Sequence, residues 1–127
     1  MAESPSTSPE NVYKCPDGYE GRTAYGATAD LAIIRECLSN ARDAAQELGD
    51  TDFATQVEAI LPDLMDYQVG VSGALQEWYY DWADHDPQHR HQSHLIGVYP
   101  GHQIPAGTEL ADAAHRTLEI RGFRPYE

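Results

Sequence analysis

The chain has 127 residues, enough for one small domain, and apolar residues make up 41% of it. Eight basic residues stand against 21 acidic ones, which gives a formal net charge of −13. Such a charge repels nucleic acid and anionic membranes, so neither is an expected partner. No stretch is apolar over the length that a membrane-spanning helix needs. Cys15 and Cys37 lack CxxC spacing and are interpreted either as one disulfide or as two buried thiols.

Residues 1–27 contain prolines and glycines in turn-like settings and no helical period, which predicts a loop with a tight turn at residues 16–18. Pro5 and Pro9 restrict the backbone on the approach to Glu10, and this stiffness suits a pre-positioned acid. The alternative is that a Ser/Thr/Pro-rich stretch near a terminus is a disordered linker.

After this loop, apolar residues recur at alternating three- and four-residue steps, which predicts an amphipathic helix. The stripe consists of Leu31, Ile34, Leu38, Ala41, Ala45 and Leu48. Thr28 or Asp30 can cap the start of the helix, and Gly49 stands where a left-handed residue ends one. Asp50 opens a second helix that Pro62 stops, so the two helices are expected to form an αα-hairpin.

The second half of the chain predicts less regular structure. Residues 64–80 are rich in aromatic and branched side chains but contain two glycines, so we expect only a short strand around residues 67–71. Residues 81–107 hold all but one of the six histidines and predict a long polar loop. Helical spacing returns from Glu109 to Arg121, and Gly122 closes that helix.

Three helices cannot bury their stripes against one another and also organise loops that make up much of the chain. We therefore expect a piece of a larger all-α domain, in which helical hairpins pack side by side. The long loops would gather at one end of that domain and form the site.

The densest polar cluster, residues 84–95, has three interpretations. His89, His91 and His94 are potential metal ligands, but spacings of two and three residues do not put all of them on one helical face. Arg90, with its forked donors, and the imidazoles suit a polyhydroxylated ligand. The third interpretation is a solvated histidine-rich loop.

Residues 73–82 place two tryptophans and two tyrosines among acidic residues. Aromatic faces stack on sugar rings while carboxylates and amides bind the hydroxyls, so this segment suits a carbohydrate site. The alternative is that the aromatic side chains form the core. Glu77 also has two interpretations: a general acid desolvated by its neighbours, or one half of a buried ion pair with Arg90.

Inverting glycoside hydrolysis needs a protonated carboxylic acid at the leaving oxygen and a base on the opposite face, roughly 6.5–9.5 Å away. Glu10 is the candidate acid. Asp81, Asp84 and Asp86 are candidate bases, but nothing in the sequence distinguishes one of them. Ser93 lacks a GxSxG turn and an oxyanion-hole loop, so serine-based acyl transfer is discarded.

Four motifs follow one another in order along the chain: SPSTSPEN at Ser4–Asn11, ADLAIIR at Ala29–Arg35, LQEW at Leu75–Trp78 and HRHxSHLxGxYPG at His89–Gly101. Together they resemble the inverting α-L-fucosidases of glycoside hydrolase family 95, which act chiefly on α-1,2-linked fucose. The resemblance covers nearly the whole chain. It implies an all-α fold, a partial (α/α)6 barrel, of which this chain would be an internal portion.

The resemblance also implies roles for particular residues. Glu10, the glutamate of SPEN, is implied as the general acid. The implied substrate-binding residues are Arg90 and His91 of HRH, Asn11 of SPEN, and Glu77 and Trp78 of LQEW. No cofactor and no metal are implied, and the expected partners are a fucosylated oligosaccharide and the remainder of the catalytic domain.

In this family, asparagine residues supported by an aspartate activate the water, and neither motif occurs in this chain. We therefore expect the chain to hold the acid without the water-activating half and to be inactive alone. The expected layout is an active-site loop at 1–27, a helical hairpin at 28–61, aromatic and His-rich loops at 62–107 and a helix at 108–122.

Two alternative functions stay open at this stage. One is a non-catalytic carbohydrate-binding or vestigial module, and the other is a metal-binding helical domain. Related activities such as α-L-galactosidase also stay open, because residues outside this chain can read the substituent that distinguishes such sugars.

Overall fold

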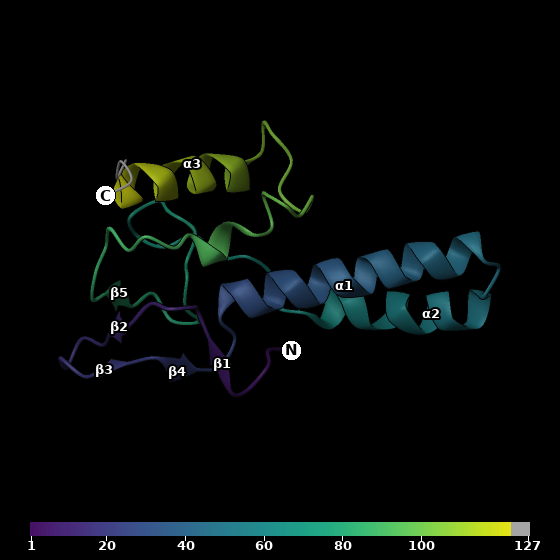
Figure 1. Cartoon of the computed structure of the whole chain (residues 1–127), viewed down its shortest axis with the longest axis horizontal. Helices are drawn as coiled ribbons and strands as arrows, with labels where there is room; N and C mark the ends of the chain where they lie inside the picture. Colours follow the sequence, from purple (N-terminus) through teal and green to yellow (C-terminus); the bar gives the residue numbers. More distant parts are fainter. Residues whose placement is uncertain (123–127) are drawn as a thin grey trace.

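A computed structural model describes residues 1–122. Within them, the α-helices are α1 (Thr28–Glu47), α2 (Thr51–Ile60) and α3 (Glu109–Arg121). Two short 3₁₀ helices are η1 (Leu61–Asp63) and η2 (Ser93–Leu95). The two-residue strands are β1 (Ser6–Thr7), β2 (Tyr13–Lys14), β3 (Glu20–Gly21), β4 (Thr23–Ala24) and β5 (Ala83–Asp84). The α1–α2 hairpin projects from a body that contains the strands, the long loops and α3 (Figure 1).

The expected all-α fold, a partial (α/α)6 barrel, is wrong. Strand β1 pairs with β4, and β3, β2 and β5 form a three-stranded antiparallel sheet in that order. Four of these strands lie in residues 1–27, which were expected to be loop. Each strand has only two residues, too few to show the alternating pattern that predicts a strand. The pairing of β2 with β5 joins Tyr13 to Asp84, a contact that local sequence cannot reveal.

The tight turn expected at residues 16–18 is present and joins β2 to β3. The Gly18 amide donates to the Cys15 carbonyl at 2.9 Å, and the Asp17 carboxylate accepts from the Tyr19 amide at 2.9 Å. Both interpretations of the cysteines are wrong: Cys15 and Cys37 are free thiols, and Cys37 is exposed. Cys15 lies in the turn between β2 and β3, whereas Cys37 lies on α1, and the two are not paired.

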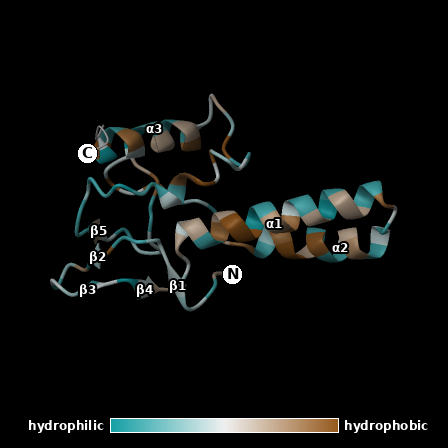
Figure 2. Cartoon of the chain, viewed as in Figure 1, coloured by the Kyte–Doolittle hydropathy of each residue, from teal (hydrophilic) through white to brown (hydrophobic). Residues whose placement is uncertain are grey.

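The two helices expected from the periodicity are present as α1 and α2, and both carry alternating hydrophilic and hydrophobic residues (Figure 2). Gly49 between them has φ of +75°, a conformation that glycine adopts at little cost. The Asp50 carboxylate caps α2 by accepting from the Phe53 amide at 3.2 Å. Leu48, expected on the buried stripe, is 85% exposed at the end of α1. None of the described helices has the length and apolarity to cross a bilayer.

The start of α1 is held by the body rather than by the expected side-chain caps. The residue before α1 forms no capping bond through its side chain. Thr28 instead donates to the Gln76 carbonyl at 2.6 Å, and the Asp30 carboxylate accepts from the Ser6 hydroxyl at 2.8 Å. The first turn of α1 is therefore bonded to β1 and to the segment that precedes Glu77.

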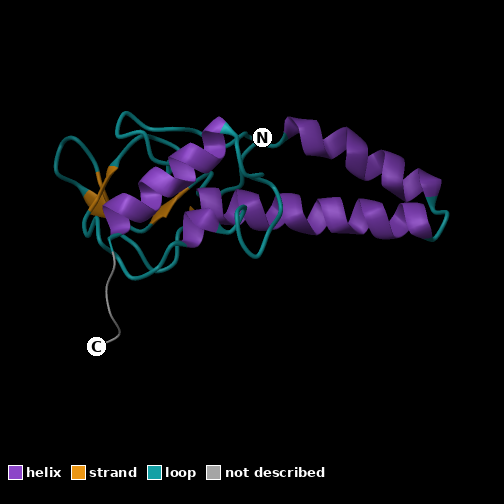
Figure 3. Cartoon of the chain, turned by 90° about the horizontal axis from the view of Figure 1, so that it is seen from above, coloured by secondary structure: helices purple, strands orange, loops and turns teal. Residues whose placement is uncertain are grey.

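Helix α3 packs on a separate core cluster at the end of the molecule that carries the strands (Figure 3). The buried members of this cluster are Leu75, Leu95, Ile104, Ala113 and Ala114. The buried hydroxyl of Thr117 accepts from the Leu75 amide at 3.1 Å and donates to the Ala113 carbonyl at 3.0 Å. The short strand expected around residues 67–71 is wrong, since that segment forms only an isolated bridge between Val69 and Leu75.

Replacing Thr117 with Val should lower the free energy of unfolding by about 1–3 kcal/mol, because the shape is kept while the buried Leu75 amide loses its acceptor. Urea denaturation followed by circular dichroism measures this. The same substitution at Thr55, an exposed α2 residue whose hydroxyl donates to Thr51 of its own helix, should cost less than about 0.5 kcal/mol. Equal losses at the two positions would contradict the role given to Thr117.

Candidate active site

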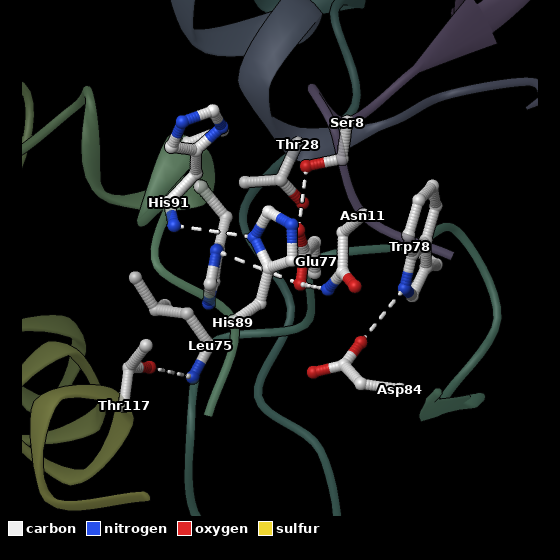
Figure 4. A network of polar contacts seen from close by, with 12 residues as sticks. Ser8, Asn11, Thr28, Leu75, Glu77, Trp78, Asp84, His89, His91 and Thr117 are labelled. Carbon is white, nitrogen blue, oxygen red and sulfur yellow. Dashed lines mark hydrogen bonds and ion pairs between the residues drawn. The ribbon is translucent and has the colours of Figure 1, made fainter. Parts of the chain in front are cut away.

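A buried carboxylate, that of Glu77, gathers three donors from distant parts of the chain. Its Oε1 accepts from the Ser8 hydroxyl at 2.7 Å. Its Oε2 accepts from the Asn11 amide at 2.9 Å and from Arg121 Nη2 at 2.6 Å. Ser8, Asn11 and Glu77 are at most 5% exposed. Figure 4 shows the side chains of Ser8 and Asn11, which come from the same segment of the chain, pointing toward Glu77.

Arg121, the last residue of α3, satisfies its buried guanidinium with four groups. Besides Glu77, it donates from Nη1 to Asp84 Oδ2 at 2.8 Å and to the Pro87 carbonyl at 3.0 Å, and from Nε to the His91 carbonyl at 3.3 Å. Burial alone would lower the pKa of Arg121, but the Glu77 and Asp84 carboxylates outweigh burial and raise it. Burial, followed by the Glu77 carboxylate, raises the pKa of Asp84.

The turn of residues 8–11 between β1 and β2 carries Glu10 at its tip, and the chain holds the backbone on both sides of it. The Asn11 amide donates to the Ser8 carbonyl at 2.8 Å and closes the turn. The Pro9 carbonyl accepts from the Ser93 hydroxyl at 2.5 Å and contacts His91 Nδ1 at 3.3 Å. The backbone around Glu10 is therefore fixed at the residues before and after it.

The Glu10 side chain itself is exposed and lies against Arg90. Arg90 Nη2 donates to Glu10 Oε2 at 2.6 Å, and the two side chains are 68% and 65% exposed. The structure thus brings together Glu10, Arg90 and His91, although the first is separated from the other two by about 80 residues of sequence. A carboxyl group, a guanidinium and an imidazole on one face can together bind a polyhydroxylated ligand, and the carboxyl group can donate a proton to it when it is in its acid form.

The remaining expected site residues form a buried layer rather than part of this exposed face. Asn11 and Trp78 are each 2% exposed and Glu77 is 5% exposed. Trp78 donates from its indole to Asp84 at 3.1 Å, and its ring meets the Tyr13 ring edge-on at 5.2 Å. Trp78 therefore packs as a core residue. Glu77 forms a buried ion pair, as one interpretation held, but its partner is Arg121 instead of Arg90.

The histidines do not assemble a metal site within residues 1–122, where no three His, Cys, Asp or Glu side chains are placed to hold an ion. His94 is 3% exposed, and its Nδ1 lies 3.9 Å from Glu77 Oε2 without a hydrogen-bond partner. Burial, reinforced by the Arg121 charge, lowers the pKa of His94 to about 3. His94 is thus a neutral core residue at neutral pH and does not belong to the exposed face that carries His91.

A cavity of about 340 Å³ borders the buried layer on another side. Glu77, Asp84, His94 and Arg121 line it together with apolar and aromatic residues, whereas Glu10, Arg90 and His91 do not. The cavity and the exposed face are therefore separate features, and the Glu77–Arg121 pair lines the cavity only.

Neither Arg121 nor Ser8 was predicted as a site residue from the sequence. Arg121 had a recognisable signal, because it follows Ala113, Ala114 and Thr117 on the buried face of α3 at helical spacing. An arginine on such a face marks a buried cation that needs carboxylate partners. Ser8 had no local signal, since its partner lies 69 residues away.

Comparisons with known proteins place this chain in a family. The family model for the glycosyl hydrolase family 95 catalytic domain matches residues 1–126. A protein named alpha-L-fucosidase 2 from Arabidopsis thaliana is 37% identical over 126 residues, which cover 96% of this chain and 15% of that protein. A probable alpha-fucosidase A from Aspergillus oryzae is 32% identical over 144 residues, which cover 99% of this chain and 18% of that protein. The chain spans less than a fifth of the length of these curated relatives.

The stability of the chain should fall as the pH drops from about 6.5 toward 3. In the unfolded chain His94 takes up a proton near its ordinary pKa of 6.5, whereas in the folded chain it does so only near 3, so acid favours unfolding in this window. The loss attributable to His94 is at most about 1.4 kcal/mol per pH unit. Urea denaturation at pH 7, 6 and 5 measures it.

His94→Gln should flatten this pH dependence, because glutamine does not titrate. His115→Gln, which changes a histidine whose side chain is 76% exposed, should leave the dependence as it is in the parent chain. A His94→Gln variant with the parent's slope would show that His94 is not the group responsible.

Proposed function

We propose that this chain, which belongs to glycosyl hydrolase family 95, supplies the general acid and part of the sugar site of an inverting α-L-fucosidase. Glu10 protonates the glycosidic oxygen, and Arg90 and His91 orient the fucose. The observation that carries the proposal is the contrast at Glu10, whose backbone is fixed on both sides while its carboxylate is exposed beside Arg90.

A fixed backbone beneath an exposed carboxyl group suits a general acid. The acid must lie within hydrogen-bond reach of one oxygen of the substrate, and small displacements of a catalytic group are costly. The bonds at Ser8, Pro9 and Asn11 hold the turn, and the side chain of Glu10 is exposed and can reach a ligand once Arg90 releases it.

Arg90 has a role that changes when sugar binds. Its pair with Glu10 is largely exposed, and exposed ion pairs are weak, so the guanidinium can exchange the carboxylate for sugar hydroxyls. Its forked donors match neighbouring hydroxyls. In this proposal the exchange holds the fucose and releases Glu10 from the guanidinium, so that Glu10 can carry the proton that it donates to the glycosidic oxygen.

His91 would supply the complementary acceptor. Its Nδ1 faces the Pro9 carbonyl, which can only accept, so the hydrogen-bonded neutral imidazole carries its proton on Nδ1. Nε2 is then an acceptor for a sugar hydroxyl. Arg90 donates and His91 accepts, which is the pairing that a hydroxyl-rich ring requires.

We propose that the water-activating residues lie outside this chain. Asp84 is bound by Arg121 and Trp78, Asp81 accepts from the Val71 amide at 2.8 Å, and Asp86 accepts from the Gln88 amide at 3.0 Å. None of these contacts distinguishes one of the three as a base. The family resemblance implies asparagine and aspartate motifs for this step, which this sequence does not contain, and the remainder of the catalytic domain would supply them.

The 127-residue chain alone should release no fucose from 2′-fucosyllactose above the rate in buffer, because it lacks a group that activates the attacking water. Enzymatic detection of free L-fucose measures this. Robust turnover by the isolated chain would refute this part of the proposal.

A hybrid enzyme tests the role of Glu10. In it, this chain replaces the matched segment of the Arabidopsis alpha-L-fucosidase 2. Glu10→Gln should lower kcat on 2′-fucosyllactose by about 10²–10⁴-fold, because the leaving oxygen is no longer protonated. The loss should be much smaller on α-L-fucosyl fluoride, whose leaving group needs less help from an acid. The matched control is Glu47→Gln, at the exposed last residue of α1, which should leave kcat unchanged.

Two outcomes would contradict the proposal. Equal losses of kcat on both substrates would mean that Glu10 does not act as the acid. Fucose binding without hydrolysis, in the hybrid and in its Glu10→Gln variant alike, would favour the alternative of a non-catalytic carbohydrate-binding module.

A further inference from the structure

We infer that Arg121 is a positioning residue that couples the 8–11 turn to the loop of residues 87–93. The first of these segments carries Glu10, and the second carries Arg90 and His91. The inference rests on the function proposed for these three residues, and it assigns to α3 a part in the site that none of the sequence motifs indicated.

The contact with the 8–11 turn runs through Glu77. Arg121 donates to Glu77 Oε2 at 2.6 Å, and the same carboxylate holds Ser8 at 2.7 Å and Asn11 at 2.9 Å. Ser8 and Asn11 flank the Pro9-Glu10 tip of the turn. Without the guanidinium, the buried Glu77 charge would lose its counterion and the turn would lose the anchor that both flanking residues share.

The contact with the 87–93 loop is direct. Arg121 donates to the Pro87 carbonyl at 3.0 Å and to the His91 carbonyl at 3.3 Å, so it contacts the loop on both sides of Arg90. The two segments also meet at the surface, where Ser93 donates to the Pro9 carbonyl. One side chain of α3 thus contacts the segment that carries Arg90 directly and the segment that carries Glu10 through Glu77.

The geometry explains why this residue is an arginine. Its Nε, Nη1 and Nη2 reach different partners, on Glu77, Asp84, Pro87 and His91, from one rigid plane. A lysine would keep the positive charge but offers a single ammonium centre, which cannot reach partners on both segments in the same way. The charge alone would therefore not restore the coupling.

In the hybrid enzyme, Arg121→Lys should lower kcat on 2′-fucosyllactose about tenfold when Glu10 is present. In the Glu10→Gln background the same change should lower kcat less than about threefold, because Arg121 acts partly through Glu10. A residue that merely kept the enzyme folded would cost the same factor in both backgrounds, and equal factors would overturn the inference. If Glu10→Gln itself leaves kcat unchanged, the proposed function fails, and the following measurement on the chain still decides the coupling.

Amide hydrogen exchange in the 127-residue chain, read by NMR, tests the coupling without any reference to catalysis. Arg121→Lys should speed exchange at least tenfold at the Asn11 or the His91 amide while α2 keeps its protection. Arg116→Met, at a half-exposed arginine of the same helix that contacts Ser72 and Glu119, should change neither amide. Unchanged exchange at both amides in Arg121→Lys would overturn the inference.

A milder variant covers the case in which the Arg121 change unfolds the chain. Ser8→Ala removes one hydroxyl from Glu77 and leaves the charges paired. It should speed exchange at Asn11 and also, through Glu77 and Arg121, at His91. Faster exchange at Asn11 with His91 unaffected would show that the two segments are independent and would overturn the inference.

Discussion

The buried ion pair between Glu77 and Arg121 is the interaction on which the rest of this structure depends. Their charged groups lie 2.6 Å apart, and the side chains are 4% and 3% exposed. Taking two such charges out of water costs several kcal/mol per ion, which their attraction offsets only when further hydrogen bonds satisfy both groups. Those bonds come from Ser8, Asn11 and Asp84 and from two backbone carbonyls, so the pair requires distant segments to stay in place.

This requirement gives the site two layers with different properties. The lower layer, which contains Glu77, Arg121, Ser8 and Asn11, is buried, and hydrogen bonds among these residues satisfy the Glu77 carboxylate. The upper layer, with Glu10 and Arg90, is exposed and held by one weak pair. A buried, hydrogen-bonded layer below exposed charged side chains is the arrangement that the proposed acid and sugar-binding roles need, because the backbone is held while the side chains can exchange partners with a ligand.

The sequence predicted what depends on neighbouring residues and missed what depends on distant ones. Helices α1, α2 and α3 follow from apolar spacing, and the glycine that ends α1 follows from its position. The strands were not predicted, because a strand of two residues is too short to show the alternation of apolar and polar residues that predicts one. The family resemblance, and not spacing, implied that Glu10 and Arg90 belong to one site, and their direct contact was not predicted. The spacing of α3 is enough to predict that Arg121 is a charged residue on the buried face of that helix. Its partners could not be predicted, because even the nearest of them in sequence, the His91 carbonyl, is 30 residues away.

The most direct test of this account is a crystal structure of the hybrid enzyme, in its Glu10→Gln form, with a fucosylated oligosaccharide bound. We expect Arg90 to contact the fucose hydroxyls and the side chain of residue 10 to face the glycosidic oxygen. The contacts of Arg121 with Glu77 and with the His91 carbonyl should remain within hydrogen-bond distance. A sugar bound away from residue 10, or an Arg121 separated from Glu77 while the sugar is in place, would contradict the account.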